Sequence, residues 1–181
     1  MDKYKLKFTR FQNTIFRLLC IHAGESLNQR EIAKLLGFSP TAVAKALPLL
    51  EKEGLVCVER SKTMNLTFIK LNRDSQKALE LKRVENLKLI YESGLVKFLE
   101  DNFPGGVVIL FGSYSYGEDT INSDIDIAII ERKEKKVNLE KFEKFLKRDI
   151  RINFYEDFNK IHKNLRSNIF NGIVLIGRIG L

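Results

Sequence analysis

Apolar residues in the first part of the chain recur every three or four positions, which is the spacing of one face of an α-helix. This spacing predicts a helix over residues 8–22. Asn28 precedes Glu31 by three positions, the pattern of a capping box, and Gly37 follows at a position typical of a helix end. We therefore expect a second, short helix between Asn28 and Gly37.

A third helix is predicted to begin at Ser39 and Pro40. Ser is a favoured N-cap, and Pro fits the first helical position because its missing N–H has no partner there. Gly54 ends this helix, and Pro48 inside it removes a hydrogen bond, so we expect a kink. The apolar positions that share one face of the helix are Val43, Leu47 and Leu50.

Two strand-like runs and a long helix follow. Residues 55–60 and 65–71 alternate as strands and are joined by the turn 61–64, which predicts a β-hairpin. Residues 72–92 form one long helical pattern, capped by Asn72 and broken at residues 93–94. An apolar stripe on this helix fits either a rigid spacer or the seam of a homodimer; its members are Leu81, Val84, Leu87 and Tyr91.

Three helices followed by a hairpin resemble a winged helix-turn-helix, and the segment that carries the resemblance is LNQREIAKLLGFSPTAVAKALPLLEKEGLV. The resemblance covers about the first 72 residues and implies that the helix from Pro40 enters the major groove of double-stranded DNA. The residues implied to face that groove are Ser39, Thr41, Ala42 and Lys45. Arg60 and Lys62 would contact phosphate or the minor groove. The alternative is a winged helix used for protein contact only.

The net charge of +8 belongs to the first half of the chain. Residues 1–90 contain 17 Lys and Arg against 9 Asp and Glu, whereas residues 91–181 contain 14 of each. Clustered basic side chains favour a polyanionic partner, because they release counterions from a phosphate backbone. A solvated, Lys-rich surface is the alternative explanation of the charge alone.

The second half begins with a buried strand that leads into a glycine–serine turn. Residues 107–111 are all apolar and are followed directly by Gly112 and Ser113. A second strand over residues 123–130 places Asp124 and Asp126 on one face, since strand side chains alternate. The turn offers backbone N–H groups to a phosphate, and the paired carboxylates can hold hard cations.

The stretch LFGSYSYGEDTINSDIDIAII resembles the core motif of the polymerase-β-like nucleotidyltransferase superfamily, in its minimal single-domain branch. The resemblance covers residues 95–181, where the remaining pattern predicts a helix over about 138–148, a strand over 150–155, a helix from Asp157 and a last strand over 173–176. It implies that Gly112 and Ser113 contact the phosphates of a nucleoside triphosphate, with ATP as the first choice, and that Asp124 and Asp126 bind two Mg²⁺ ions. The implied reaction transfers a nucleoside monophosphate to an acceptor hydroxyl. Proteins of this branch often pair with a helical partner that they nucleotidylate.

The chain departs from this family pattern at the third carboxylate, which active members carry on the next strand. That strand covers residues 149–155, and Asn153 aligns with the acid. Asp149 substitutes if the register slips, and Arg151 is placed to meet the triphosphate or to neutralise Asp124. Two functions therefore stay open: an Mg²⁺-dependent nucleotidyltransferase with a DNA-binding winged helix, or a DNA-binding regulator whose transferase domain only senses a nucleotide or holds a partner.

The remaining sequence features set the class of protein. The predicted architecture is α+β, with a winged helix over 1–72, a linker helix over 73–94, and a small mixed β-sheet with flanking helices over 95–181. A membrane span needs about 18 apolar residues, and no such run is present. Two cysteines without metal-type spacing favour a reducing compartment, so we expect a cytoplasmic protein without a membrane partner.

Overall fold

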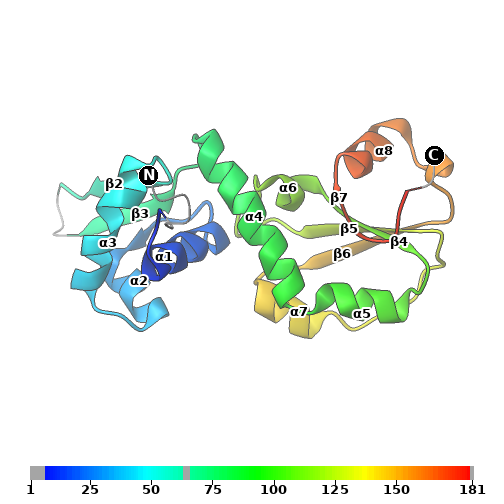
Figure 1. Cartoon of the computed structure of the whole chain (residues 1–181), viewed down its shortest axis with the longest axis horizontal. Coiled ribbons are helices and arrows are strands. Elements are labelled where there is room, and N and C mark those ends of the chain that lie inside the picture. The colour runs from blue at the N-terminus through cyan, green and yellow to red at the C-terminus, as the bar shows by residue number, and fades with distance from the viewer. Residues whose placement is uncertain (1–6, 63–65, 180–181) are drawn as a thin grey trace. The chain divides into compact units, whose positions relative to one another are not determined.

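The computed structural model describes residues 7–62 and 66–179. The chain divides into two compact units, Met1–Lys82 and Arg83–Leu181, and the division falls inside helix α4 (Gln76–Glu92; Figure 1). The architecture is mixed α+β, as the sequence predicts.

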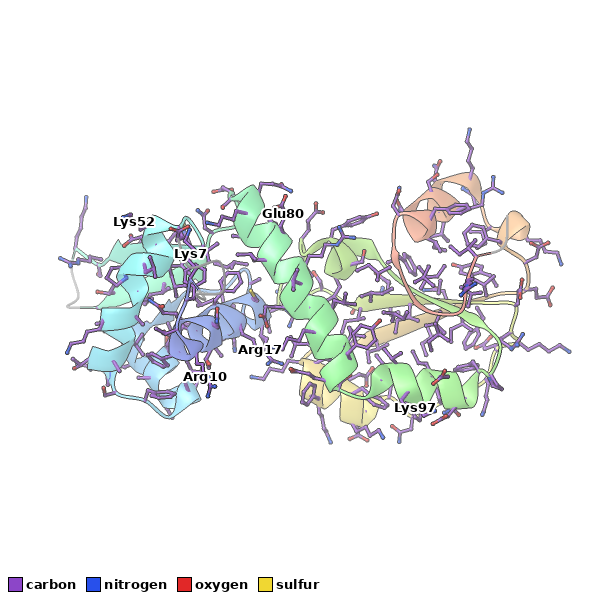
Figure 2. All side chains as sticks on the ribbon, viewed as in Figure 1. Lys7, Arg10, Arg17, Lys52, Glu80 and Lys97 are labelled. Atoms are coloured by element: carbon purple, nitrogen blue, oxygen red, sulfur yellow. The ribbon has the colours of Figure 1, made fainter. Side chains whose placement is uncertain are left out.

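The first unit contains the three helices expected from the apolar spacing. They are α1 (Arg10–Ile21), α2 (Gln29–Leu36) and α3 (Pro40–Lys52). Figure 2 shows Arg10 on the first turn of α1 and Lys52 on the last turn of α3. Helix α3 continues through Pro48. Side chains from all three helices meet in a common core, including Ile15, Leu19, Ile32, Val43 and Leu50, each at most 1% exposed.

Side-chain caps fix where α2 and α3 begin, and they confirm the predicted starts of these two helices. The Asn28 side chain accepts from the backbone N–H groups of Arg30 and Glu31, at 2.9 and 3.0 Å. Ser39 Oγ accepts from the Ala42 N–H at 3.1 Å. Gly37, after α2, has a φ of +71°, a backbone conformation that glycine adopts without strain.

The hairpin of the first unit is part of a three-stranded antiparallel sheet. Strands β2 (Val56–Arg60) and β3 (Thr67–Leu71) match the prediction, and β1 (Leu27–Asn28) adds to the other edge of β3. The sequence did not predict β1, because two residues are too short to show alternation. Within the predicted hairpin, Thr63, Met64 and Asn65 lie outside the described residues.

Helix α4 begins four residues later than predicted, so the assignment of Asn72 as its cap is wrong. Asn72 Nδ2 donates instead to the Gly54 carbonyl at 3.0 Å, and its Oδ1 accepts from the Asp74 N–H at 3.3 Å. Ser75 Oγ accepts from the Ala78 N–H at 3.3 Å and takes over the cap. The loop thus uses Asn72 to join the end of α3, a contact that local pattern does not reveal.

The second unit is built on a four-stranded mixed sheet with the order β6-β5-β4-β7. Its strands are β4 (Val107–Phe111), β5 (Ile125–Ile130), β6 (Ile150–Tyr155) and β7 (Ile173–Ile176). The β5–β6 pair is parallel and the other two pairs are antiparallel. All five residues of β4 are buried, as the unbroken apolar run predicts.

Helices cover both faces of this sheet (Figure 1). The helices after α4 are α5 (Leu95–Asn102), α6 (Gly112–Tyr116), α7 (Glu140–Leu146) and α8 (Lys163–Phe170). Ile169 of α8 packs on the face that carries Ala128 and Ile130, whereas Phe103, after α5, contacts Phe154 on the other face.

Several helix boundaries in the second unit differ from the sequence prediction. The helix expected from Asp157 is divided into a 3₁₀ turn (Phe158–Lys160) and α8, with buried Ile161 between them. The helix expected over 138–148 is shorter, and helices α5 and α6 were not predicted. Helix α6 occupies five residues, which is too short for a periodic apolar pattern to register.

Candidate functional site

The glycine–serine turn lies directly against one of the two aspartates. Strand β4 ends at Phe111, which pairs with Asp126 of β5, so the next residue, Gly112, sits beside that carboxylate. Gly112 has a φ of +73°, and a Cβ atom built on it would lie 2.7 Å from Asp126 Oδ2. Both the backbone conformation and the close approach require glycine here. The structure therefore brings Gly112, Ser113 and Asp126 together, as the motif spacing predicts.

Asp124 and Asp126 flank a buried isoleucine at the start of β5. Asp124 directly precedes the strand, and Ile125 and Ile127 are 0% exposed. The pKa of Asp126 is raised, first because burial disfavours its charged form and second because the Asp124 carboxylate lies nearby; Arg151 opposes the shift. A cation bound between the two carboxylates would relieve both effects.

The parallel neighbour β6 places a basic residue next to Asp126. In the observed register Asp126 pairs with Arg151, and Ala128 pairs with Asn153. The Arg151 guanidinium lies 2.7 Å from Asp124 Oδ2. Of the roles considered from the sequence, neutralisation of Asp124 is the one the geometry shows.

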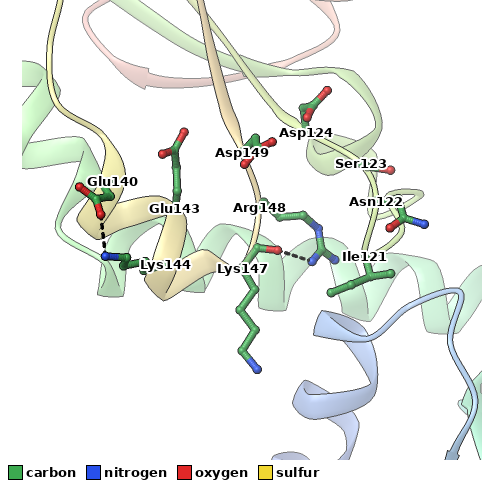
Figure 3. A pocket seen from close by; sticks show the side chains of 10 residues that line it. All are labelled: Ile121, Asn122, Ser123, Asp124, Glu140, Glu143, Lys144, Lys147, Arg148 and Asp149. Atoms are coloured by element: carbon green, nitrogen blue, oxygen red, sulfur yellow. Dashed lines mark hydrogen bonds and ion pairs between the residues drawn. The ribbon is translucent and has the colours of Figure 1, made fainter.

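Asp149, the other candidate for a third acid, lines an open pocket of about 520 Å³ together with Asp124 (Figure 3). Its backbone carbonyl accepts from the Ile125 N–H at 2.8 Å, which joins the starts of β5 and β6. Within residues 7–62 and 66–179, no group of three or more His, Cys, Asp or Glu side chains is arranged to hold a metal ion. A cation bound here would have the carboxylates of Asp124 and Asp126 as its acidic ligands, and among the described residues no third acid completes a set with them.

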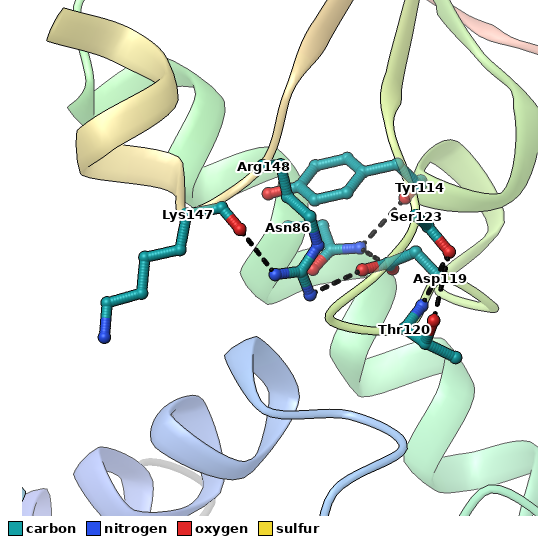
Figure 4. Close-up of polar contacts among 7 residues, drawn as sticks. All are labelled: Asn86, Tyr114, Asp119, Thr120, Ser123, Lys147 and Arg148. Carbon is teal, nitrogen blue, oxygen red and sulfur yellow. Dashed lines mark hydrogen bonds and ion pairs between the residues drawn. The ribbon is translucent and has the colours of Figure 1, made fainter.

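A buried polar network holds the loop between the turn and the aspartates (Figure 4). Arg148 Nη2 lies 3.3 Å from Asp119 Oδ2, and the two side chains are 1% and 0% exposed. Asn86 Nδ2 donates to Asp119 Oδ1 at 2.7 Å and to the Tyr114 carbonyl at 2.9 Å. Sequence reasoning missed this network, because Asp119 and Arg148 are 29 positions apart and no local motif links them.

A turn at residues 120–123 leads from this network to Asp124. The Thr120 N–H donates to Ser123 Oγ at 2.9 Å, and the two hydroxyl groups lie 3.3 Å apart. Such side-chain-to-backbone bonds stabilise turns. The network and the turn together position Asp124, which Arg151 contacts.

The residues predicted to meet DNA lie on the surface of the first unit. Ser39, Thr41 and Lys45 are exposed on and before the first turns of α3, and Ala42 is half-buried. Arg60, at the end of β2, and Lys62 are also exposed. Two exposed apolar side chains of the same unit were not predicted: Leu35 (50% exposed) and Phe38 (51% exposed).

Two further observations concern the class of protein. In the part of the chain that the structure describes, no helix has the length and apolar character to cross a membrane. Cys20 and Cys57 are both free thiols, and Cys20 is buried.

Comparison with protein families gives one match in each of the two compact units. Residues 92–176 match the nucleotidyltransferase domain family. Residues 12–63 match the MarR family. The first match includes the glycine–serine turn and both aspartates, and the second includes α2 and α3.

Solved structures that are similar to this chain include those of two bacterial proteins. Adhesin competence repressor (AdcR) from Streptococcus pyogenes is 22% identical, with 54% of this chain and 69% of that chain covered and a TM-score of 0.41. A ZitR variant from Lactococcus lactis is 23% identical, with 57% and 67% covered and a TM-score of 0.42. No curated protein matches the chain significantly.

Proposed function

The chain joins a MarR-like winged-helix domain to a nucleotidyltransferase domain, and from this combination we propose a DNA-binding nucleotidyltransferase. The second unit would bind a nucleoside triphosphate, with ATP as the first choice, together with Mg²⁺. It would transfer the nucleoside monophosphate to an acceptor hydroxyl. The first unit would bring the protein to double-stranded DNA.

The approach of Gly112 to Asp126 carries this proposal. A phosphate on the backbone of Gly112 and Ser113 would lie next to the carboxylates, because no side chain separates the turn from Asp126. Asp124 and Asp126 would hold Mg²⁺, which when bound offsets the charge of the triphosphate and of the leaving pyrophosphate. The contribution of the protein would be to position the nucleotide and to stabilise charge.

A second candidate function is a DNA-binding regulator that binds a nucleotide without transferring it. The ion pair between Arg151 and Asp124 favours this function, because a guanidinium occupies a carboxylate that an active site would use for metal binding. Loss of the third acid weakens activation of the acceptor hydroxyl more than it weakens binding of a single cation with its nucleotide.

A thermal shift experiment tests nucleotide binding, which both candidates require. Mg²⁺-ATP should raise the Tm of the full chain, because a ligand that binds only the folded state stabilises it. Asp124→Ala with Asp126→Ala should abolish the shift, whereas Glu134→Ala, in the exposed loop after β5, should keep it. A shift that survives the double substitution would show that the nucleotide binds elsewhere.

Radiolabelled nucleotides separate the two candidates. With each of the four NTPs labelled at the α-phosphate, a transferase should place label on an acceptor that is present in the assay. If Mg²⁺-ATP raises the Tm and no label is transferred in the presence of candidate protein partners, the regulator is the better description.

The partners and compartment are also part of the proposal. Ser39, Thr41, Ala42 and Lys45 would face the major groove, and Arg60 and Lys62 the phosphate backbone. A protein partner could supply the acceptor hydroxyl. Residues 12–63 match the MarR family, which supports DNA binding by a homodimer. Two free thiols fit the reducing conditions of the cytoplasm.

A further inference from the structure

Strand β6 presents alternating side chains on the face that it shares with the two aspartates. The positions on this face, in order, belong to Asp149 before the strand and to Arg151 and Asn153 within it. Because Arg151 is the residue of β6 that pairs with Asp126, the strand position beside this carboxylate carries a positive charge. Asp149 lies one step before this position and Asn153 one step after it.

The guanidinium of Arg151 forms an ion pair with Asp124 and stays exposed to solvent. Its Nη2 atom lies 2.7 Å from Asp124 Oδ2, and the two side chains are 69% and 25% exposed. A guanidinium matches carboxylate and phosphate groups, since it offers several N–H donors in one plane. It can therefore keep its contact with Asp124 and also meet a phosphate from solvent.

Charge limits what else the pair of carboxylates can bind. Asp124 and Asp126 carry two negative charges, and one divalent cation balances them. With Arg151 in contact with Asp124, a second divalent cation at the same carboxylates would meet like charge at close range, and no third acid in residues 7–62 and 66–179 is arranged with these two to offset it.

We propose that Arg151 takes the place of a second divalent cation, so that the site binds one Mg²⁺ with each nucleotide. The inference rests on the proposed nucleotide site and specifies its chemistry: a triphosphate held by one cation and one guanidinium. Asp126 and the carboxylate of Asp124 would hold the cation, and Arg151 would supply the remaining positive charge.

The number of bound cations tests this proposal directly. Mn²⁺ replaces Mg²⁺ and is counted by electron paramagnetic resonance, with the full chain saturated by an ATP analogue that cannot be cleaved between the α- and β-phosphates. We expect one bound Mn²⁺ per chain and, for Arg151→Asp, two. Lys136→Asp makes the same change of charge in an exposed loop at the other end of β5 and should keep the number at one.

A second variant covers the case in which Arg151→Asp does not fold. Arg151→Gln removes the guanidinium without adding an acid, and its exposed position should tolerate the change. Arg151→Gln should raise the affinity for the first Mn²⁺ by up to about fivefold, since exposed ion pairs are worth at most about 1 kcal/mol. An unchanged affinity would overturn the proposal, because the Arg151 guanidinium would then exert no electrostatic effect at the cation site.

The results separate this inference from the proposed function. Two Mn²⁺ ions in the unaltered chain, with the nucleotide bound, would overturn the role of Arg151 and leave the nucleotide site in place. Failure of the nucleotide analogue to bind would overturn both.

Discussion

Gly112 shows how a single residue type makes the site possible. Its φ of +73° strains any residue with a side chain, and its Cβ would collide with Asp126. We expect Gly112→Ala to lower the free energy of unfolding by about 1–2 kcal/mol through backbone strain. Displacement of the carboxylate should also weaken Mg²⁺-ATP binding by about tenfold or more, measured by calorimetric titration.

Gly37→Ala is the matched control for this substitution. Gly37 has nearly the same φ, +71°, but a Cβ there would have no heavy atom within 4 Å. The control should therefore show a similar loss of stability and bind Mg²⁺-ATP with unchanged affinity. Equal loss of binding in both variants would mean that backbone strain, and not contact with Asp126, explains the effect of Gly112→Ala.

Glu53 gives the first unit a pH dependence. Its Oε2 atom lies 2.5 Å from both Lys7 Nζ and Lys77 Nζ, and these hydrogen bonds lower its pKa from 4.5 to about 2, with Lys7 as the larger cause. The folded-state pKa lies below the unfolded one, so this stabilisation is complete above about pH 4.5 and is lost as the pH falls towards 2.

We therefore expect Glu53→Gln to lower the Tm at neutral pH, where the ionised carboxylate stabilises the fold. The variant should also show a shallower fall of Tm between pH 4.5 and pH 2 than the unaltered chain. Circular dichroism melting curves across this range provide the measurement, and Glu51→Gln, two residues earlier on the exposed surface of α3, is the control. Parallel Tm profiles for all three proteins would contradict the assignment.

At the scale of elements, the pair Arg148–Asp119 joins the start of β6 to the loop before β5. Removing one partner of a buried ion pair leaves an uncompensated charge and costs about 3–5 kcal/mol. We expect Arg148→Met to lower the free energy of unfolding by about this amount in urea titrations. Arg148→Met combined with Asp119→Asn should recover part of the loss, since no buried charge then remains unbalanced.

An exposed ion pair of the same unit is the control for Arg148→Met. Lys144 Nζ lies 2.6 Å from Glu140 Oε1, and both side chains are more than two thirds exposed. Lys144→Met should cost at most about 1 kcal/mol, because solvent screens the pair. A comparable loss in the two variants would show that burial does not strengthen the Arg148 pair.

An element could be predicted from the sequence when the residues that determine it are close together in the chain. Strands β4, β6 and β7 have the predicted bounds, because unbroken or alternating apolar residues define them. The caps at Asn28 and Ser39 are also local and were correct. Strand β1 and the true start of α4 depend on partners far along the chain, so the local pattern did not show them. The domain boundaries at residues 72 and 94 stay predictions.

At the scale of the whole molecule, the excess of basic residues in the first half predicts how DNA binding responds to salt. Lys45→Glu in the full chain should weaken binding to double-stranded DNA about tenfold or more. It should also reduce the slope of log affinity against log salt concentration by about one, the value for one lost phosphate contact. Lys133→Glu makes the same change of net charge outside the winged helix and should leave both quantities unchanged. Fluorescence anisotropy at several salt concentrations provides the measurement; binding without salt dependence would contradict a phosphate contact.

The sequence by itself determined the two domain types, the glycine–serine turn and the pair of aspartates, because each depends on residues that are close together in the chain. Only the tertiary structure decided what Arg151 contacts and how Arg148 is paired. Both outcomes depend on how β6 lies against β5 and on the loop before β5. Packing sets that register between segments about 25 residues apart, and the same register places the Arg151 guanidinium against the pair of aspartates.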